Sequence, residues 1–167
     1  MVTPYLEVQP LTPARFARFG DVIACEGPAD QVINRGMCER FHDLAEMDFG
    51  PQGRPGISLF KAKPCSLPLM LEMMERHPLG SQTFIPMQRD PFLVVVAQDA
   101  NGIPVRPQAF LTAPGQGVSY HRNTWHGVLT TVDKSGLFAV VDRIGPGENL
   151  QEHWFEKPVE IKTVDSR

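Results

Sequence analysis

Residues 75–87 read ERHPLGSQTFIPM, and residues 115–127 read GQGVSYHRNTWHG. Both stretches place polar and ring-bearing side chains beside Gly and Pro, next to runs of alternating apolar residues. This pattern is typical of an antiparallel β protein that exposes polar groups inside a barrel. We therefore expect the two stretches to lie on neighbouring strands, with their polar side chains converging on one point. The converging residues would be His77, Gln82, Tyr120, His121, Trp125 and His126.

The composition is that of an ordinary globular protein. The 167 residues are most simply one domain, residues 1–167, and are enough to bury a core. The formal net charge of −3 argues against nucleic acid as the main partner, because such proteins normally carry a basic face. The longest apolar run, residues 92–97, is too short to span a bilayer, so no membrane association is expected.

Cysteine usage and the N-terminus bear on the compartment. Cys25, Cys38 and Cys65 are odd in number and lack C-x-x-C spacing, which predicts reduced thiols. The first residues, MVTPYLEVQP, contain no basic region followed by an apolar run, so no signal peptide is expected. Both observations favour a cytoplasmic protein.

Frequent turn residues divide the chain into short segments. Sixteen prolines and fourteen glycines favour strands and turns over a helical bundle. One short helix is predicted to begin at Thr12 and Pro13, as N-cap and first helical position, and to end at Gly20. Residues 145–167 are expected to form a polar tail. The predicted strands cover residues 6–10, 21–24, 38–44, 57–61, 69–76, 83–86, 91–98, 108–112, 128–132 and 137–142. Turns about every eight to twelve residues predict a single all-β barrel or sandwich.

Three residues are candidates for binding a metal ion. Imidazole nitrogens and an amide oxygen suit a divalent ion of borderline softness, such as Ni, Co, Mn, Fe or Zn. His77 and Gln82 are five positions apart, and His126 follows a Pro-Gly turn. Because glutamine is neutral, its attraction to a divalent ion is reduced, so we expect the ion to be weakly held.

Two histidines are candidates for acid–base chemistry. Histidine is the side chain whose unperturbed pKa lies near neutrality, so His121 and His126 could serve as base and acid. They are five positions apart, and regular alternation would place them on opposite faces of a strand. A turn or bulge at Asn123 would let both face one pocket.

Three arginines are candidates for binding an acidic ligand. Arginine binds carboxylates in bidentate fashion, so Arg40, Arg122 and Arg143 are candidates. Arg40 and His42 would share one face of the predicted strand 38–44, and the alternative is that this face is a solvated sheet edge. The sequence contains no G-x-S-x-G motif, phosphate loop or dinucleotide fingerprint, so neither covalent hydrolysis nor an organic cofactor is indicated.

Several segments of the chain resemble those of the ureidoglycolate lyase family. The resemblance rests on ERHPLGSQTFIPM (75–87), PFLVVVAQ (91–98), GVSYHRNTWHG (117–127), VDR (141–143), CERFHDL (38–44) and FGDVI (19–23). It implies a cupin-like antiparallel β-barrel of jelly-roll type, with one short N-terminal helix, that assembles as a homodimer. It also implies cleavage of (S)-ureidoglycolate to glyoxylate and urea in allantoin degradation.

Set against the cupin motifs, the chain keeps part of the usual ligand pattern. Glu75 and His77 take the two His positions of H-x-H-x-x-x-x-E, and Gln82 takes the Glu position. His126 takes the His of the second motif, P-x-G-x-x-H, and His121 falls where cupins have Pro. The resemblance implies a divalent metal, with nickel the usual assignment.

The substrate named by the resemblance is a hemiaminal, with a hydroxyl, a ureido nitrogen and a carboxylate on one carbon. Its collapse needs a base for the hydroxyl proton, an acid for the leaving nitrogen, and a cation for the carboxylate. His121 or His126 is expected as the base, Tyr120 as the proton donor, and Arg143, before Arg40, as the carboxylate partner. Further substrate-binding residues are expected to be Gln82 and Trp125.

Several alternatives stay open at this point. The barrel could be a non-catalytic binder of small acids, or a metal-dependent cupin dioxygenase or isomerase. The sequence does not rank His121 against His126, choose among the arginines, identify the metal, or show whether a second subunit completes the pocket.

Overall fold

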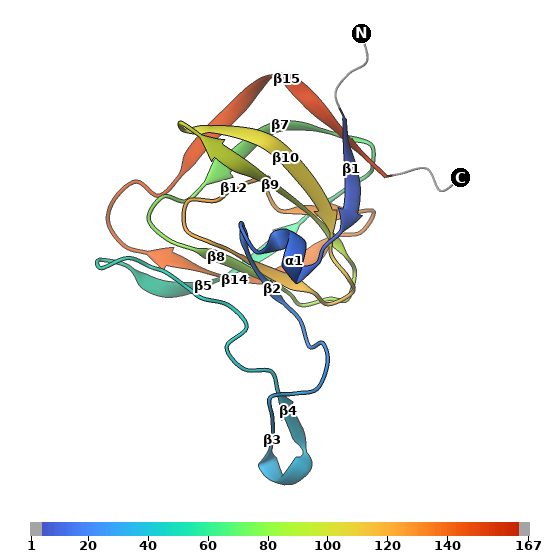
Figure 1. Ribbon diagram of the computed structural model, residues 1–167, viewed down its shortest axis with the longest axis vertical. Helices are drawn as coiled ribbons and strands as arrows, with labels where there is room; N and C mark the ends of the chain where they lie inside the picture. Colours follow the sequence, from blue (N-terminus) through green and yellow to red (C-terminus); the bar gives the residue numbers. More distant parts are fainter. Residues whose placement is uncertain (1–4, 164–167) are drawn as a thin grey trace.

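A computed structural model describes residues 5–163, and almost all of its regular structure is β-strand (Figure 1). The predicted all-β class is therefore confirmed. The strands form an eight-stranded sheet, a five-stranded sheet and a two-stranded hairpin. No helix within residues 5–163 is long and apolar enough to cross a membrane.

The eight-stranded sheet closes on itself. Its order is β10-β1-β15-β7-β12-β9-β13-β6, and closure occurs because β10 also pairs with β9. β1 runs parallel to both of its neighbours, so the barrel is mixed, where a purely antiparallel one was expected. The strands of this sheet are β1 (Tyr5–Pro10), β6 (Pro64–Cys65), β7 (Leu69–Arg76), β9 (Phe92–Ala100), β10 (Ile103–Leu111), β12 (Trp125–His126), β13 (Thr130–Val132) and β15 (Gln151–Lys162).

The five-stranded sheet lies against one side of the barrel. Its order is β2-β11-β8-β14-β5, so β5 is an edge strand. Its strands are β2 (Gly20–Ile23), β5 (Arg54–Ala62), β8 (Gln82–Pro86), β11 (Gly117–Tyr120) and β14 (Gly136–Ile144).

The apolar core falls into two clusters, which share β9. Val94 and Val96 join the cluster between the two sheets, together with residues of α1, β8, β11 and β14. Val95 and Ala97 point the other way, into the cluster enclosed by the barrel strands. Alternate residues of one strand therefore fill both cores, which explains why residues 92–97 are continuously apolar.

The short N-terminal helix is confirmed, although it is shorter than predicted. α1 (Pro13–Phe16) follows Thr12, whose side chain accepts a hydrogen bond from a backbone N–H of the first turn. Phe16, the last residue of the helix, and Phe19 are both buried in the core between the sheets. Gly20 is already the first residue of β2, so the helix ends before the glycine.

Residues 26–44 form a hairpin that projects from the body of the molecule (Figure 1). β3 (Gln31–Ile33) pairs with β4 (Cys38–Arg40) across the 3₁₀ turn η1 (Asn34–Gly36). The strand predicted for residues 38–44 stops early, because Asp43 has a φ of 53°, outside the range of β structure.

The expectation of a polar tail after residue 145 is wrong. Residues 151–162 form β15, which pairs with β7 and β1 inside the closed sheet. Pro158 argued against a strand in the sequence, because proline cannot donate a hydrogen bond to a neighbouring strand. It is tolerated because the register shifts between Trp154 and Val159, where a bulge interrupts the ladder.

The two chemistry-bearing stretches lie on neighbouring strands, as predicted. β12 pairs with β7, placing His126 opposite Glu75. β11 pairs with β8, placing Tyr120 opposite Gln82. The first pair belongs to the barrel and the second to the five-stranded sheet, so the stretches meet where the two sheets face each other.

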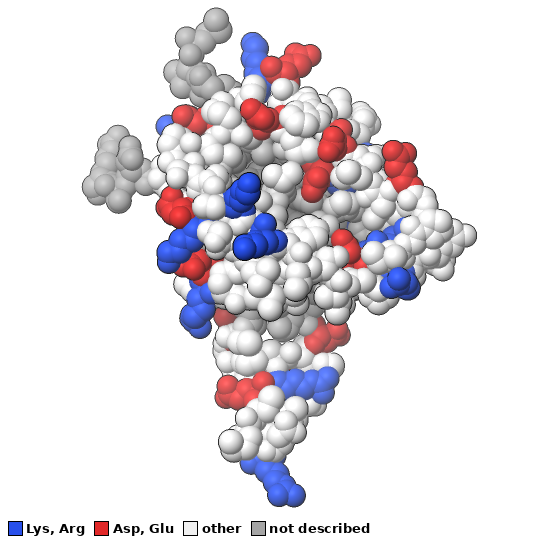
Figure 2. All heavy atoms as spheres, turned by 180° about the vertical axis from the view of Figure 1, so that it is seen from behind, with Lys and Arg blue, Asp and Glu red and all other residues white. Residues whose placement is uncertain are grey.

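The face of the molecule drawn in Figure 2 carries no dominant charge of one sign. On the face drawn in Figure 2, positive and negative side chains are interspersed among uncharged residues. The three cysteines are free thiols, as predicted.

Candidate active site

Three side chains that can ligate a metal converge between the sheets. Glu75 is the last but one residue of β7, His77 follows that strand, and His126 lies on β12. One donor atom from each lies within 4.8 Å of those of the other two. The two imidazole rings are 5.3 Å apart between centroids. We call Glu75, His77 and His126 the triad.

The facing sheet supplies three further polar side chains. Tyr120, Gln82 and Asp142 occupy equivalent positions on the adjacent strands β11, β8 and β14. The Tyr120 ring stacks on His126, with centroids 4.3 Å apart and planes 4° from parallel. Gln82 Nε2 donates to Asp142 Oδ2 at 3.5 Å.

Backbone carbonyls set the tautomers of both imidazoles. His77 Nδ1 lies 2.7 Å from the Asn149 carbonyl oxygen, and His126 Nδ1 lies 3.0 Å from that of Gly127. A carbonyl can only accept, so each Nδ1 carries the hydrogen. In a neutral ring with this tautomer, Nε2 keeps its lone pair, which is the arrangement typical of metal-binding histidines.

Burial controls the charges of the cluster. Desolvation, helped by the neighbouring His77, lowers the pKa of His126 to about 3, so its ring is neutral at physiological pH. Desolvation raises the pKa of Glu75, an effect that His77 partly offsets. Burial, with a smaller contribution from the charge of Glu75, raises the pKa of Tyr120 well above its ordinary value, so the phenol stays protonated.

The cluster contains buried acceptors without partners. Within residues 5–163, the buried side-chain atoms that lack a hydrogen bond are His77 Nε2, Gln82 Oε1, His126 Nε2 and Asp142 Oδ1. With both Nδ1 atoms protonated, all four accept hydrogen bonds or donate lone pairs. Leaving such groups buried and unpaired is costly, so the site is suited to a cation or to a ligand rich in N–H and O–H groups.

A divalent metal ion fits these residues. Two imidazole nitrogens and a carboxylate form a common ligand set for borderline divalent ions. The sequence suggested His77, Gln82 and His126, and the cupin motifs placed Glu75 at a further ligand position; the structure brings Glu75, His77 and His126 together. Gln82 faces them from the other sheet.

Asp142 was not among the site residues predicted from the sequence. The alternation of β14 could have identified it. Phe138 and Val140 are buried in the core between the sheets, whereas the residues on either side of them are less buried. Continuing that alternation by one step places Asp142 on the same inward face.

The structure does not bring His121 to the cluster. The anticipated turn exists, with Asn123 at a φ of 66°, but it leaves His121 on the outer side. The His121 side chain is 42% exposed, and its Nε2 lies 3.4 Å from Asp21 Oδ2. It lines a surface depression of about 360 Å³ together with Arg18 and Arg122.

Trp125 faces away from the triad. It pairs with Ala97 and packs into the core enclosed by the barrel, whereas its neighbour His126 pairs with Val96 and points between the sheets. Trp125 Nε1 donates to Asp99 Oδ1 at 2.8 Å.

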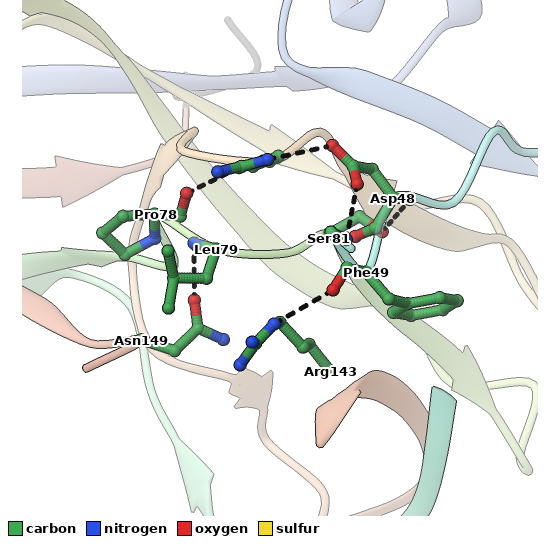
Figure 3. A network of polar contacts seen from close by, with 9 residues as sticks. Asp48, Phe49, Pro78, Leu79, Ser81, Arg143 and Asn149 are labelled. Carbon is green, nitrogen blue, oxygen red and sulfur yellow. Dashed lines mark hydrogen bonds and ion pairs between the residues drawn. The ribbon is translucent and has the colours of Figure 1, made fainter. Parts of the chain in front are cut away.

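Arg143 and Arg40 are engaged elsewhere. Figure 3 shows Arg143 directed at Phe49, whose carbonyl accepts from Nε at 3.0 Å. Its Nη2 donates to the Pro146 carbonyl at 2.9 Å. Arg40 lies on the projecting hairpin, where it contacts His42 at 2.8 Å.

Asn149 was also missed and has a positioning role. Its backbone carbonyl accepts from His77, and its Oδ1 accepts from the Leu79 N–H at 2.7 Å (Figure 3). Both contacts hold the segment that carries His77. A single asparagine in a Gly- and Pro-rich loop gives no sequence signal for this role.

The chain is similar to known proteins over almost its whole length. A family model described as "Ureidoglycolate lyase" matches residues 3–162. A protein of Rhodobacter capsulatus named "Ureidoglycolate lyase" is 57% identical over 157 residues, covering 94% of this chain and 98% of the relative. "Ureidoglycolate lyase 2" of Rhizobium meliloti is 51% identical over 158 residues, covering 94% and 97%. A "Ureidoglycolate lyase" of Chelativorans is 51% identical over 154 residues, covering 92% and 93%.

Proposed function

The chain belongs to the ureidoglycolate lyase family, and from this premise we propose how its buried cluster cleaves (S)-ureidoglycolate to glyoxylate and urea. The observation that carries the proposal is the triad of Glu75, His77 and His126 with the protonated Tyr120 stacked on it. The reaction moves one proton from the hydroxyl and delivers one to the leaving nitrogen while the carbon–nitrogen bond breaks. It requires no oxidant and no covalent enzyme intermediate.

Glu75 is the group best suited to take the hydroxyl proton. An effective base has a pKa near the working pH, and burial moves the pKa of Glu75 upward in that direction. His126, with a pKa of about 3, is a poor proton acceptor but a good lone-pair donor at neutral pH. His121 lies outside the cluster.

Tyr120 would deliver the proton to the departing urea nitrogen. Its raised pKa keeps the phenol protonated, and its stacking on His126 fixes the ring beside the triad. As the carbon–nitrogen bond breaks, the nitrogen becomes basic enough to draw this proton.

His77, His126 and one carboxylate oxygen of Glu75 would hold a divalent ion, with nickel the family's usual assignment. The other oxygen of Glu75 would stay free to take the hydroxyl proton. Bound there, the ion would supply the positive charge that the carboxylate and hydroxyl oxygens of the substrate require. The protein's own part is to orient both rings, because the carbonyls of Asn149 and Gly127 accept from Nδ1 and leave Nε2 as the atom for the ion.

The product balance tests this function. Purified protein incubated with (S)-ureidoglycolate should release urea and glyoxylate in equal amounts, without consuming oxygen. A purely binding barrel would release neither product, and a dioxygenase would consume oxygen. Ammonia appearing in place of urea would refute the lyase reaction.

We further propose that the protein is a homodimer that works in the cytoplasm, in allantoin degradation. Free cysteines suit a reducing compartment. The outer face of the five-stranded sheet exposes large apolar side chains next to the open edge of β5, and such patches are typical of interfaces. The patch consists of Ile57, Leu59, Ile85 and Leu137.

If the protein is a homodimer, the mass of the particle in solution should be twice that of one chain. Light scattering should give twice the mass of one chain for the wild type and a monomer for the Ile57→Asp, Leu59→Asp double variant, because two carboxylates would be buried in the interface. Ile103→Asp, which is exposed on β10, should remain dimeric. A monomeric wild type, or an unaffected double variant, would refute the proposed interface.

A further inference from the structure

We propose that Asp142 and Gln82 form the subsite that recognises the ureido group, with Asp142 Oδ1 and Gln82 Oε1 accepting hydrogen bonds from its N–H groups. The inference rests on the proposed function and adds to it the orientation of the substrate. It also gives a role to Asp142, which takes no part in the proton transfers described above.

The geometry begins with the two strands that carry the pair. Gln82 on β8 lies directly opposite Asp142 on β14, so both side chains point into the space between the sheets. Each places one atom toward the other, with Gln82 Nε2 3.5 Å from Asp142 Oδ2. The remaining polar atoms, Gln82 Oε1 and Asp142 Oδ1, are buried and have no partner among the described residues.

The carboxylate determines which way the amide points. An ionised Asp142 can only accept hydrogen bonds, so the stable orientation of Gln82 directs its NH₂ group at the carboxylate. The amide oxygen is then left facing the cluster. The pair consequently presents two acceptor oxygens together.

The two ends of ureidoglycolate differ in the groups that they offer. The acid end carries only acceptor oxygens around a negative charge, and it would be repelled by Asp142. The ureido end carries N–H groups on both nitrogens. Acceptor oxygens therefore select the ureido end. The acid end is left to the side formed by Glu75, His77 and His126, where a bound divalent ion would supply the positive charge.

This pairing would also discriminate between ligands. A site with buried acceptors penalises any ligand that cannot donate to them, because the acceptors lose water and gain nothing in return. Small acids without a ureido group, such as glyoxylate itself, should therefore gain nothing from Asp142.

Calorimetric binding of two ligands tests the inference. Oxalurate carries a carboxylate and a ureido group and lacks the hydroxyl, so it binds without reacting, whereas glyoxylate carries only the acid end. In Asp142→Asn, the new amide can place an NH₂ group against the N–H groups of the ligand. We expect the Kd of oxalurate to rise by about 10- to 100-fold, and that of glyoxylate to stay within about twofold.

A second variant and a control complete the design. Gln82→Met removes the other acceptor at similar volume and should weaken oxalurate selectively in the same way. Asp90→Asn makes the same chemical change at an exposed residue paired with Lys134, and should leave both ligands unaffected. Thermal unfolding of each variant verifies folding.

The outcomes separate this inference from the proposed function. If the wild type cleaves ureidoglycolate but Asp142→Asn and Gln82→Met leave oxalurate binding unchanged, or weaken glyoxylate equally, the ureido subsite is wrong and the function stands. If the wild type neither cleaves ureidoglycolate nor binds oxalurate, both are wrong.

Discussion

Replacing His126 by Ala is expected to lower kcat for urea release by about 10²- to 10⁴-fold, the range typical of groups at a reacting centre. His126 is 1% exposed, contributes an unpartnered Nε2 to the triad, and supports the ring of Tyr120. One substitution therefore disturbs both the lone-pair donor and the proton donor. His77→Ala should lower kcat nearly as much.

His121→Ala is the matched control, because it removes the same side chain from the other end of the same turn. His121 is partly exposed and contacts Asp21, so its loss should change kcat by less than about threefold, within the range of surface substitutions. Thermal unfolding should show that both variants fold. A folded His126→Ala variant with near wild-type kcat, or an equal loss in His121→Ala, would contradict the site.

Removing the charge of Glu75 is expected to weaken metal binding by more than about 100-fold, beyond the loss typical of outer-shell changes. Glu75 is the only carboxylate of the triad, and the other two members are imidazoles, which carry no negative charge to attract the ion. Chelator competition and elemental analysis of Glu75→Gln measure this loss independently of catalysis. The wild type should itself release its ion on dialysis against a strong chelator, since Gln82 adds no charge.

Glu152→Gln provides the control. Glu152 lies opposite Glu75 across the β15–β7 ladder and is exposed, so this variant should retain the ion. Equal retention by Glu75→Gln and the wild type would show that Glu75 is not a ligand. A wild-type protein that never binds a divalent ion would contradict the proposed ligand set altogether.

Local patterns predicted much of the barrel. Alternation and the flanking prolines of residues 69–76 predicted β7 with its observed bounds. The dipeptide Asn101-Gly102, a strong hairpin signal, connects β9 and β10, with both residues at positive φ. These elements depend on nearby residues, so a single sequence carries their signal.

Longer-range packing decided the rest. β15 contains a proline that is acceptable only because a bulge coincides with it, and β1 runs parallel to neighbours that are far apart in sequence. His121 and His126 lie at opposite ends of the turn after β11. Sequence alternation could not show that His126 would be enclosed between the sheets and that His121 would be left at the surface. Arg143 shows the same limit, because its partners are backbone carbonyls of two loops.

A crystal structure of the protein with bound oxalurate tests the central claim most directly, namely that ureidoglycolate is cleaved at the buried triad. The account predicts oxalurate between the two sheets, with its acid end on the side of His77 and His126 and its ureido group on Gln82 and Asp142. Oxalurate bound instead in the outer depression beside His121 and Arg122, with the space between the sheets unchanged, would contradict it.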